Sequence, residues 1–525
     1  MSEEVSTTTM AWRPRANPWL IALAVMLATF MVILDTSIAV VALPYIAGNL
    51  GATQDESTWV LTSYLVANAI ILPASTWFSA FFGRKRFLIG CTIIFTLASL
   101  LCGLATSMTM LVISRVLQGL GGGAMQPLSQ AILLESFPPA KRGAATALFG
   151  IAIVVAPILG PTLGGWLTDN WSWRWTFYIN LPVGILAFFL MSWLVEDPPY
   201  IRNKKPGRID GIGFGLVALF LGTLQIMLDK GQDADWFSAV WMRWFAVVCG
   251  LSLIGFIVRE LSAANPLVDL HVFKDRNFTV SCFLFGLFGV MLYALIAIQP
   301  LFLQSLLGYS AFDAGLSVSP RGIGAFAALF FVGVLVGRVD SRLLAGLGFA
   351  VLGISSFLLC RLSLQMAISN AILPNILAGF ATGCLFVPLT TLAVGTLRNE
   401  QIGNAMSLQN LIRNTGGSIG LSVVSTLQER FAQVHQSMMV GQLSVLNPQY
   451  QKKTNALQHL FEQRFSPADA LARAHDLLYR TLLQQSDYWA FMDLFFLLAC
   501  ICAVCVFGIL LYEKPRAIHA VAAAE

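Results

Sequence analysis

Long uninterrupted runs of apolar residues constrain this chain more than any other feature of its sequence. The runs at 19–32 and 87–104 contain no charged side chain. About 20 mostly apolar residues are needed to cross a hydrocarbon core of ~30 Å, and a backbone in lipid must satisfy its own hydrogen bonds. Charged residues make up only 11% of the chain, against about 25% in soluble domains. The sequence therefore predicts an all-α polytopic membrane protein.

The hydropathy pattern predicts fourteen spans joined by mostly short loops. The predicted spans are 19–43, 58–80, 87–106, 109–133, 144–167, 174–195, 211–229, 241–259, 278–304, 312–336, 342–361, 371–396, 405–428 and 488–511. They divide the chain into an N-terminal tail (1–18), a six-span bundle (19–195), two extra central spans with their loops (196–277), a second six-span bundle (278–511) and a C-terminal tail (512–525).

The distribution of lysine and arginine predicts how the spans are oriented. Most basic residues lie in the tails and in the even-numbered loops, and few lie in the short odd-numbered loops. Cytoplasmic loops carry the excess of positive charge in membrane proteins. We therefore expect both termini in the cytoplasm and the long polar segment 429–487 on the outer face. Within that segment, Ser466-Pro467 is a typical helix start.

A weak internal repeat relates the two predicted bundles. GGAMQPLSQA begins at Gly122 and GCLFVPLTTL begins at Gly383, and each places a Pro-Leu pair at Pro127 or Pro388. The offset is half of the chain. Transporters built from parallel repeats bind their substrate between the halves, near the middle of the membrane.

Asp35 is the ionisable residue whose position in the sequence is least expected. It lies in the first span, about 24 Å along the helix axis from its start, in the outer half of the membrane. Burial away from water disfavours a charged carboxylate, so such a group can exchange a proton with its surroundings near neutral pH. We expect proton coupling at Asp35. The alternative is a carboxylate near the rim, or one hydrogen-bonded to Thr36 or Ser37.

Several other polar residues lie within apolar stretches, where they usually face a cavity or a partner. We expect a role in the substrate cavity or in coupling for Arg115, Gln118, Gln126, Asn68, Asn410 and Arg413, with Asn180 as a further candidate for the cavity. A structural clamp between helices is the alternative for Arg115. Arg321 and Asp493 are interpreted as structural. The loop LDKGQDADWF after span seven is interpreted as a solvated turn.

Span five is unusually rich in proline and glycine. Pro157, Gly160, Pro161, Gly164 and Gly165 lie within nine residues. Proline removes a backbone donor and bends a helix, and glycines on one face permit close helix contact. We expect a hinge or seal between the two halves; close packing alone is the alternative.

Taken together and in order, these motifs resemble the major facilitator superfamily, and within it the fourteen-span EmrB-type drug:proton antiporters. The resemblance rests on Leu34 to Pro44, on Arg115, Gln118 and Gly119, and on Ala156 to Gly165. The loop after span two keeps the motif's basic end at Gly83, Arg84, Lys85 and Arg86, but Ala80 and Phe81 replace its usual Asp-Arg pair. The cytoplasmic charge latch of the family is therefore in question.

The resemblance implies the major facilitator fold and a multidrug efflux transporter of the bacterial inner membrane. It implies a proton gradient as the driving force, with no cofactor and no metal. It also implies export of hydrophobic or amphipathic compounds by alternating access, within a tripartite exporter with an EmrA-type periplasmic adaptor and an outer-membrane channel. The alternatives are a dedicated exporter of one metabolite class, such as a fatty acid, siderophore or lipid, and a transporter-like sensor or membrane enzyme. The absence of any soluble catalytic motif or phosphate-binding loop disfavours the last alternative and binding of nucleic acid is not indicated.

Overall fold

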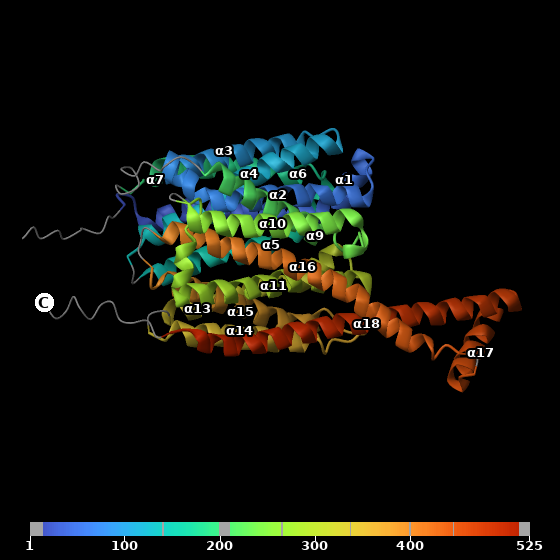
Figure 1. Cartoon of the computed structure of the whole chain (residues 1–525). Helices are drawn as coiled ribbons and strands as arrows, with labels where there is room; N and C mark the ends of the chain where they lie inside the picture. The colour runs from blue at the N-terminus through green and yellow to red at the C-terminus, as the bar shows by residue number, and fades with distance from the viewer. Residues whose placement is uncertain are drawn as a thin grey trace, which may run out of the picture.

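The computed structural model of the chain describes residues 14–138, 141–198, 210–263, 266–335, 338–397, 401–444 and 446–513. Predictions for the two ends of the chain at 1–13 and 514–525, and for the basic loop at 199–209, lie outside these ranges. Within them the structure is almost entirely helical, and the long helices run roughly side by side in one bundle (Figure 1).

The N-terminal half comprises seven helices, of which the short α6 and α7 together occupy the sixth predicted span. They are α1 (Pro18–Leu50), α2 (Gln54–Phe82), α3 (Arg84–Gly103), α4 (Met108–Ser136), α5 (Arg142–Asn170), α6 (Trp175–Tyr178) and α7 (Asn180–Leu194). Their starts follow local chemistry. Thr53 and Glu56 form a reciprocal capping box at the start of α2.

Two helices, α9 (Gly211–Lys230) and α10 (Val240–Ser262), form a hairpin between the halves, with the short η2 (Trp236–Ser238) at its turn. The guanidinium of Arg259 on α10 bonds the Asp210 carboxylate at 2.8 Å and lowers the pKa of Asp210, which caps α9. The sequence indicated a solvated turn here, but two of its side chains bond other helices. Thr62 of α2 donates a hydrogen bond to Asp229, and the Trp236 indole donates one to Thr426 at 3.1 Å.

The C-terminal half begins with the short η3 (Leu270–Lys274) and ends with η5 (Ile509–Leu511). Between them lie α11 (Arg276–Ser305), α12 (Ala311–Val318), α13 (Pro320–Leu335), α14 (Ser341–Leu359), α15 (Ser369–Val394), α16 (Ile402–Val440), α17 (Pro448–Glu462) and α18 (Pro467–Gly508). Figure 1 shows α16 and α18 continuing beyond the bundle, with α17 at the protruding tip. The predicted start of α18 is confirmed, because Ser466 caps it and Pro467 is its first residue.

Among the described residues, eleven helices are long and apolar enough to cross a membrane, or twelve if the bent α5 is counted as one span. Two predicted spans do not pass this test: α4 and the bundle part of α16. Both are long helices packed within the bundle, and both are rich in glycine and polar residues. The observed architecture is thus an all-helical membrane fold with about eleven to twelve apolar spans.

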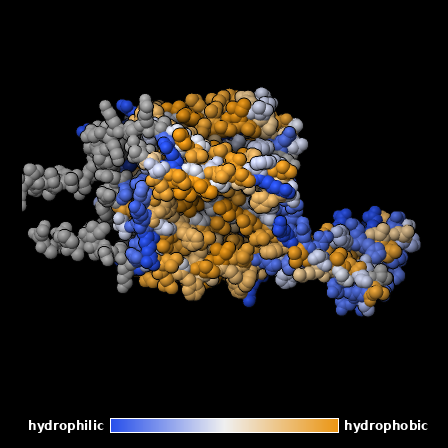
Figure 2. Space-filling view, in the orientation of Figure 1, coloured by the Kyte–Doolittle hydropathy of each residue, from blue (hydrophilic) through white to orange (hydrophobic). Residues whose placement is uncertain are grey.

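The surface agrees with a lipid environment around the bundle. Figure 2 shows apolar residues over the middle of the bundle, polar residues at its two ends, and a mostly polar protruding tip. Large apolar side chains such as Trp193 (80% exposed) and Phe507 (71% exposed) point outward from the bundle. In water these side chains would be unfavourable as a contiguous surface, whereas hydrocarbon accommodates them.

The two halves are packed alike. α4 packs against α2 and α3, and α15 packs against α13 and α14, so the repeated Pro127 and Pro388 lie in helices with corresponding neighbours. α5 and α16 make most of the contact between the halves: α5 lies against α12, α13 and α15, and α16 lies against α2 and α4. Any motion that separates the halves must therefore break the contacts of these two helices.

One end of the bundle gathers the start of α1 and the end of α18. Trp19 of α1 packs against Phe137 after α4, with ring centroids 4.9 Å apart. Arg276 at the start of α11 pairs at 2.9 Å with Glu513 after η5. Figure 1 shows the start of α1 and the end of α18 at the same end of the bundle.

Candidate functional site

The carboxylate of Asp35 lies in the interior of the N-terminal half, not at the rim. Its side chain is fully buried, on the face of α1 that looks toward α4 and α7. Three nitrogen atoms surround it: Arg115 Nη1 lies 2.6 Å from Oδ2, Gln118 Nε2 lies 2.8 Å from Oδ1, and Asn180 Nδ2 lies 2.7 Å from Oδ1. The structure thus brings together two of the predicted coupling residues and the further candidate Asn180.

Arg115 is the positive partner of this acid and is itself fully buried. Its Nε donates to the carbonyl oxygen of Val60 on α2 at 2.9 Å, and its Nη1 also donates to Gln118 Oε1 at 2.8 Å. Arg115 and Gln118 are three residues apart on α4 and so share one face of that helix. The pair therefore approaches Asp35 together.

Aromatic rings close the site on two sides. The Arg115 guanidinium lies 4.3 Å from the ring centroid of Tyr64 and 5.6 Å from that of Phe177. Cation–π contact stabilises such a charge, more so where water is excluded. Both rings are buried, so the ion pair is separated from bulk solvent.

The arrangement suits a carboxylate that is charged in this state. All three neighbouring groups donate hydrogen bonds to Asp35, and one of them is a cation. The alternative partners considered from the sequence bond elsewhere: the Thr36 hydroxyl donates to the Val32 carbonyl at 3.1 Å, and the Ser37 hydroxyl to the Pro157 carbonyl at 3.0 Å. Protonating Asp35 here would remove half of a buried ion pair, which is strongly unfavourable.

The proline- and glycine-rich segment of α5 lies directly behind this site on α1. A Cβ at Gly160 would fall 2.4 Å from Ser37 Cβ, and a Cβ at Gly164 would fall 3.2 Å from the Ile38 carbonyl oxygen. Gly165, in contrast, has nothing within 4 Å of such an atom. The helix bends by 40° between its parts 142–157 and 162–170. The side chain of Pro161 is outside the described part of the structure, and Pro157 is half-buried.

The remaining predicted cavity residues lie away from Asp35. Gln126 is two turns further along α4, about 12 Å from Gln118 along the axis. Asn410 on α16 donates to Gln130 on α4 at 2.9 Å and so joins the two halves. Arg413 is buried one turn further along α16. Of the predicted set, Arg115 and Gln118 therefore surround Asp35, and Asn410 joins the two halves.

Asn68 lies on α2, and its backbone is part of a close contact between α2 and α4. Added Cβ atoms at Gly119 and Gly123 would fall 3.2 Å from its nitrogen and 2.4 Å from its carbonyl oxygen. The side chain is half-buried, one turn beyond Tyr64.

The loop motif after α2 lies at the end of the bundle where α1 begins. Gly83 has a left-handed backbone (φ 86°), and a Cβ there would fall 2.7 Å from Asp197 Oδ2. Asp197 Oδ1 accepts from the Lys85 backbone nitrogen at 2.8 Å, and Lys85 Nζ donates to the Ser192 carbonyl at 2.6 Å. Arg86 is exposed. An acid from the end of α7 therefore meets the basic loop in which Ala80 and Phe81 replace the usual pair.

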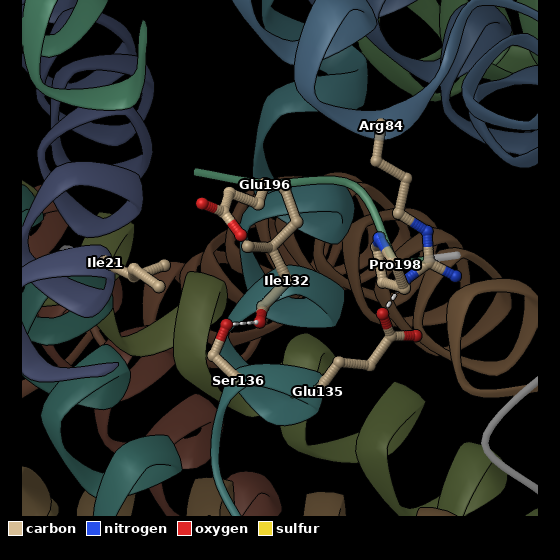
Figure 3. Close-up of a pocket in the computed structure, with 7 residues that line it drawn as sticks. All are labelled: Ile21, Arg84, Ile132, Glu135, Ser136, Glu196 and Pro198. Carbon is tan, nitrogen blue, oxygen red and sulfur yellow. Dashed lines mark hydrogen bonds and ion pairs between the residues drawn. The ribbon is translucent and has the colours of Figure 1, made fainter. Parts of the chain in front are cut away.

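Arg84 connects this loop to α4 and to the other half. Its guanidinium forms an ion pair with Glu135 near the end of α4, and both side chains are largely buried. Figure 3 shows the pair facing a small cavity, with Pro198 and Glu196 of the segment after α7 above it. A Cβ at Gly403, at the start of α16, would fall 3.3 Å from Arg84 Nη2. The loop motif thus touches the C-terminal half.

Glu135 and Asp197 were not among the residues singled out from the sequence. Glu135 is two residues from the predicted end of span four and Asp197 two residues beyond span six, where charged residues are ordinary. Only their contact with Gly83, Arg84 and Lys85 distinguishes them. The relevant signal would have been an acid at each of two span ends on the same predicted side as the basic loop.

This fold, with a buried ion pair within one of two similarly packed halves, is that of a membrane transporter. The family model for the Major Facilitator Superfamily matches residues 25–421, and the chain belongs to that superfamily. It is 38% identical to the multidrug export protein EmrB of Escherichia coli K12, over 84% of this chain and 86% of that protein.

Other relatives are named for resistance to different compounds. The chain is 37% identical to the fatty acid resistance protein FarB of Neisseria gonorrhoeae, over 89% of this chain and 90% of that protein. It is 31% identical to the colistin resistance protein EmrB of Acinetobacter baumannii, over 96% and 98%. Among solved structures, the human organic anion transporter MFSD10 aligns with a TM-score of 0.58 at 13% identity, covering 94% of this chain and all of that one. That likeness shows the fold alone.

Proposed function

We propose that this chain is a proton-coupled multidrug efflux transporter with Asp35 as its proton-carrying group. The observation that carries the proposal is the fully buried Asp35–Arg115 pair, held at 2.6 Å between helices of the N-terminal half. Ionisable residues inside a membrane protein are unfavourable and usually serve transport. The relationship to multidrug export proteins over most of the chain supports efflux as the direction of transport.

The geometry suggests how proton and cargo movements are linked. Arg115, Gln118 and Asn180 all donate hydrogen bonds to the Asp35 carboxylate, so taking up a proton requires Asp35 and Arg115 to separate. Breaking a buried pair by neutralising one partner costs about 3–5 kcal/mol, which favours a shift of α1 relative to α4 once the proton is bound. The protonated and deprotonated forms of Asp35 thereby favour two different packings.

α5 would pass this shift on to the contact between the halves. Gly160 and Gly164 of α5 lie against Ser37 and Ile38, which follow Asp35 closely on α1. The other side of α5 contacts α12, α13 and α15 of the C-terminal half. A movement of α1 at Asp35 therefore changes the packing of the one N-terminal helix that has most contact with the other half. One proton moving inward supplies about 2.3 kcal/mol per 100 mV of membrane potential.

We further propose that fourteen helices span the membrane: the twelve apolar spans, and in addition α4 and the bundle part of α16. Their glycines and polar side chains face other helices rather than lipid. The relationship to EmrB proteins supports the bacterial inner membrane as the location, and the distribution of basic residues supports cytoplasmic termini. The tip formed by α16, α17 and α18 would then project on the outer side, where it offers a docking surface for an EmrA-type adaptor and, through it, an outer-membrane channel (Figure 1).

A dedicated exporter of fatty acids is the second candidate. One observation favours it: the relationship to a fatty acid resistance protein extends over 89% of this chain, slightly more than that to the multidrug protein. The two candidates share the same fold and the same ion pair. A panel of unrelated drugs tested beside fatty acids separates them, because a dedicated exporter protects against the fatty acids alone.

Proteoliposomes with an imposed pH gradient test the proposal. We expect the unaltered chain to move a fluorescent drug against its gradient, and Asp35→Asn to abolish this movement while inserting into the membrane at the same level. Gly165→Ala is a suitable control, because an added Cβ there has no atom within 4 Å. Normal proton-driven efflux by Asp35→Asn would refute the assignment.

A further inference from the structure

A second buried cation, Arg413 on α16, has no acid beside it. Among the described residues, the acceptor for its Nε and Nη2 is the amide oxygen of its chain neighbour Asn414, at 3.4 and 3.0 Å, and its Nη1 has no acceptor. The side chain is only 3% exposed. A buried charge without a partner is strongly unfavourable, so this position requires an explanation beyond packing.

The other buried arginine of this half shows what a structural arginine looks like here. Arg321 on α13 donates from Nε to Asn375 Oδ1 at 2.7 Å, and from Nη2 to the Leu295 carbonyl and to Gln299 Oε1. Three acceptors from two other helices thus satisfy it. Arg413 receives nothing of this kind from a neighbouring helix.

A second polar side chain without partners lies one turn before Arg413. Gln409 is fully buried, and neither its amide oxygen nor its amide nitrogen has a hydrogen-bond partner in the described parts of the chain. Residues four apart share one face of a helix, so Gln409 and Arg413 face the same way. Between them, Asn410 reaches Gln130 of the N-terminal half. The two side chains therefore lie on the helix that forms the contact between the halves.

A row of phenylalanine rings leads away from Arg413 and crosses between the halves. The Arg413 guanidinium lies 5.8 Å from the ring centroid of Phe285 on α11. Phe285 lies 5.6 Å from Phe386 on α15, and Phe386 lies 6.5 Å from Phe149 on α5 of the N-terminal half. All three rings are buried in this packed state, and separating the halves would open the row between Phe386 and Phe149.

We propose that Arg413 and Gln409, together with this phenylalanine row, bind the acidic group and the apolar body of the cargo. A carboxylate or sulfonate would accept charge-assisted hydrogen bonds from Arg413 Nη1 and from the Gln409 amide. An aromatic or long apolar body would lie along Phe285, Phe386 and Phe149. This site explains why the cation is kept unpaired. It rests on the proposed export function and specifies the sign of the cargo's charge.

The test compares two compounds that differ only in charge, pyrenebutyric acid and its amide, on the purified full-length chain in a neutral detergent. Pyrene fluorescence reports binding of each at pH 7.5. We expect the unaltered chain to bind the acid about tenfold or more tightly than the amide, because hydrogen bonds to charged groups contribute about 1.5–3 kcal/mol. Arg413→Gln should remove this preference by weakening the acid alone, and Arg413→Lys should retain part of it.

Arg321→Gln is the matched control, since it removes an equally buried cation from the same half. It should leave the ratio of the two affinities unchanged, whatever it does to stability. Equal binding of acid and amide by the unaltered chain, or an unchanged preference in Arg413→Gln, would overturn the proposal. So would full displacement of the acid by an equal concentration of phosphatidylglycerol, which would assign the site to lipid. Should Arg413→Gln fail to fold, the unaltered chain and Arg413→Lys still decide.

Failure of this proposal is distinguishable from failure of the export function. Binding in detergent requires neither a proton gradient nor Asp35. A chain that prefers the acid but moves neither compound across a proteoliposome membrane would refute export and support the site at Arg413. A chain that exports both compounds equally, with Arg413→Gln unaffected, would support export and refute the site.

Discussion

Replacing Arg115 by glutamine tests the ion pair in the N-terminal half through its effect on stability. Both charged side chains are fully buried and 2.6 Å apart, so the substitution leaves the Asp35 carboxylate with only the amides of Gln118 and Asn180. Removing one partner of a buried pair destabilises by about 3–5 kcal/mol. We expect Arg115→Gln to lose stability in that range.

A double-mutant cycle measures the coupling directly. Arg115→Gln, Asp35→Asn and the double variant are purified in detergent, and their unfolding free energies are obtained by titration with sodium dodecyl sulfate. Because the double variant removes both charges, it should be clearly more stable than Arg115→Gln alone. Losses that add within about 0.5 kcal/mol would mean that the two residues act independently, and the interpretation of the pair would be wrong.

Two further predictions concern glycines. Gly160→Ala forces a Cβ to 2.4 Å from Ser37 Cβ and should destabilise by about 1–3 kcal/mol and slow efflux, while Gly165→Ala, which meets nothing, should do neither; equal effects in thermal unfolding and transport would refute the close contact of α1 and α5. Gly83→Ala places a side chain at φ 86° and 2.7 Å from Asp197 Oδ2 and should destabilise by at least about 1–2 kcal/mol. If Asp197 is part of that clash, Gly83→Ala should cost less in an Asp197→Gly background, and an unchanged cost would refute the contact.

Much of the architecture was readable from the sequence because lipid imposes a simple rule on it. Hydropathy located most of the helices that are long and apolar enough to cross a membrane, since this signal is carried by residues close together in the chain. The helix start at Ser466 was readable for the same reason. α4 and the bundle part of α16 were also predicted as spans but are less apolar than the others, and the structure shows that many of their residues are covered by other helices.

The site was readable only in part. Asp35, Arg115 and Gln118 stand out as polar residues in apolar surroundings. However, Asp35 is 80 or more residues away in sequence from the Arg115 and Gln118 that it contacts. Asn180 was a candidate for the cavity, and nothing local indicated that it bonds Asp35. Asn410 carried the same kind of signal, yet it bonds Gln130 across the contact between the halves. A polar residue in a span indicates a partner, and the three-dimensional packing decides which one.

The basic loop after α2 shows the opposite limit. The sequence indicated that Ala80 and Phe81 replace the usual Asp-Arg pair, and the loop nevertheless contacts Asp197, after α7, and Glu135, on α4. Charge near a span end is ordinary, so neither acid carried a signal of its own. Acids from elsewhere in the sequence therefore contact the loop, although the motif itself lacks one.

Proton movement coupled to cargo movement tests the central claim most directly. A gradient of cargo is imposed across the membrane of proteoliposomes that hold the purified chain, and a trapped pH indicator records protons moving in the opposite direction. We expect this counter-movement with the unaltered chain and none with Asp35→Asn inserted at the same level. Equal proton movement by the two would show that another group carries the proton, and would contradict the role given to Asp35.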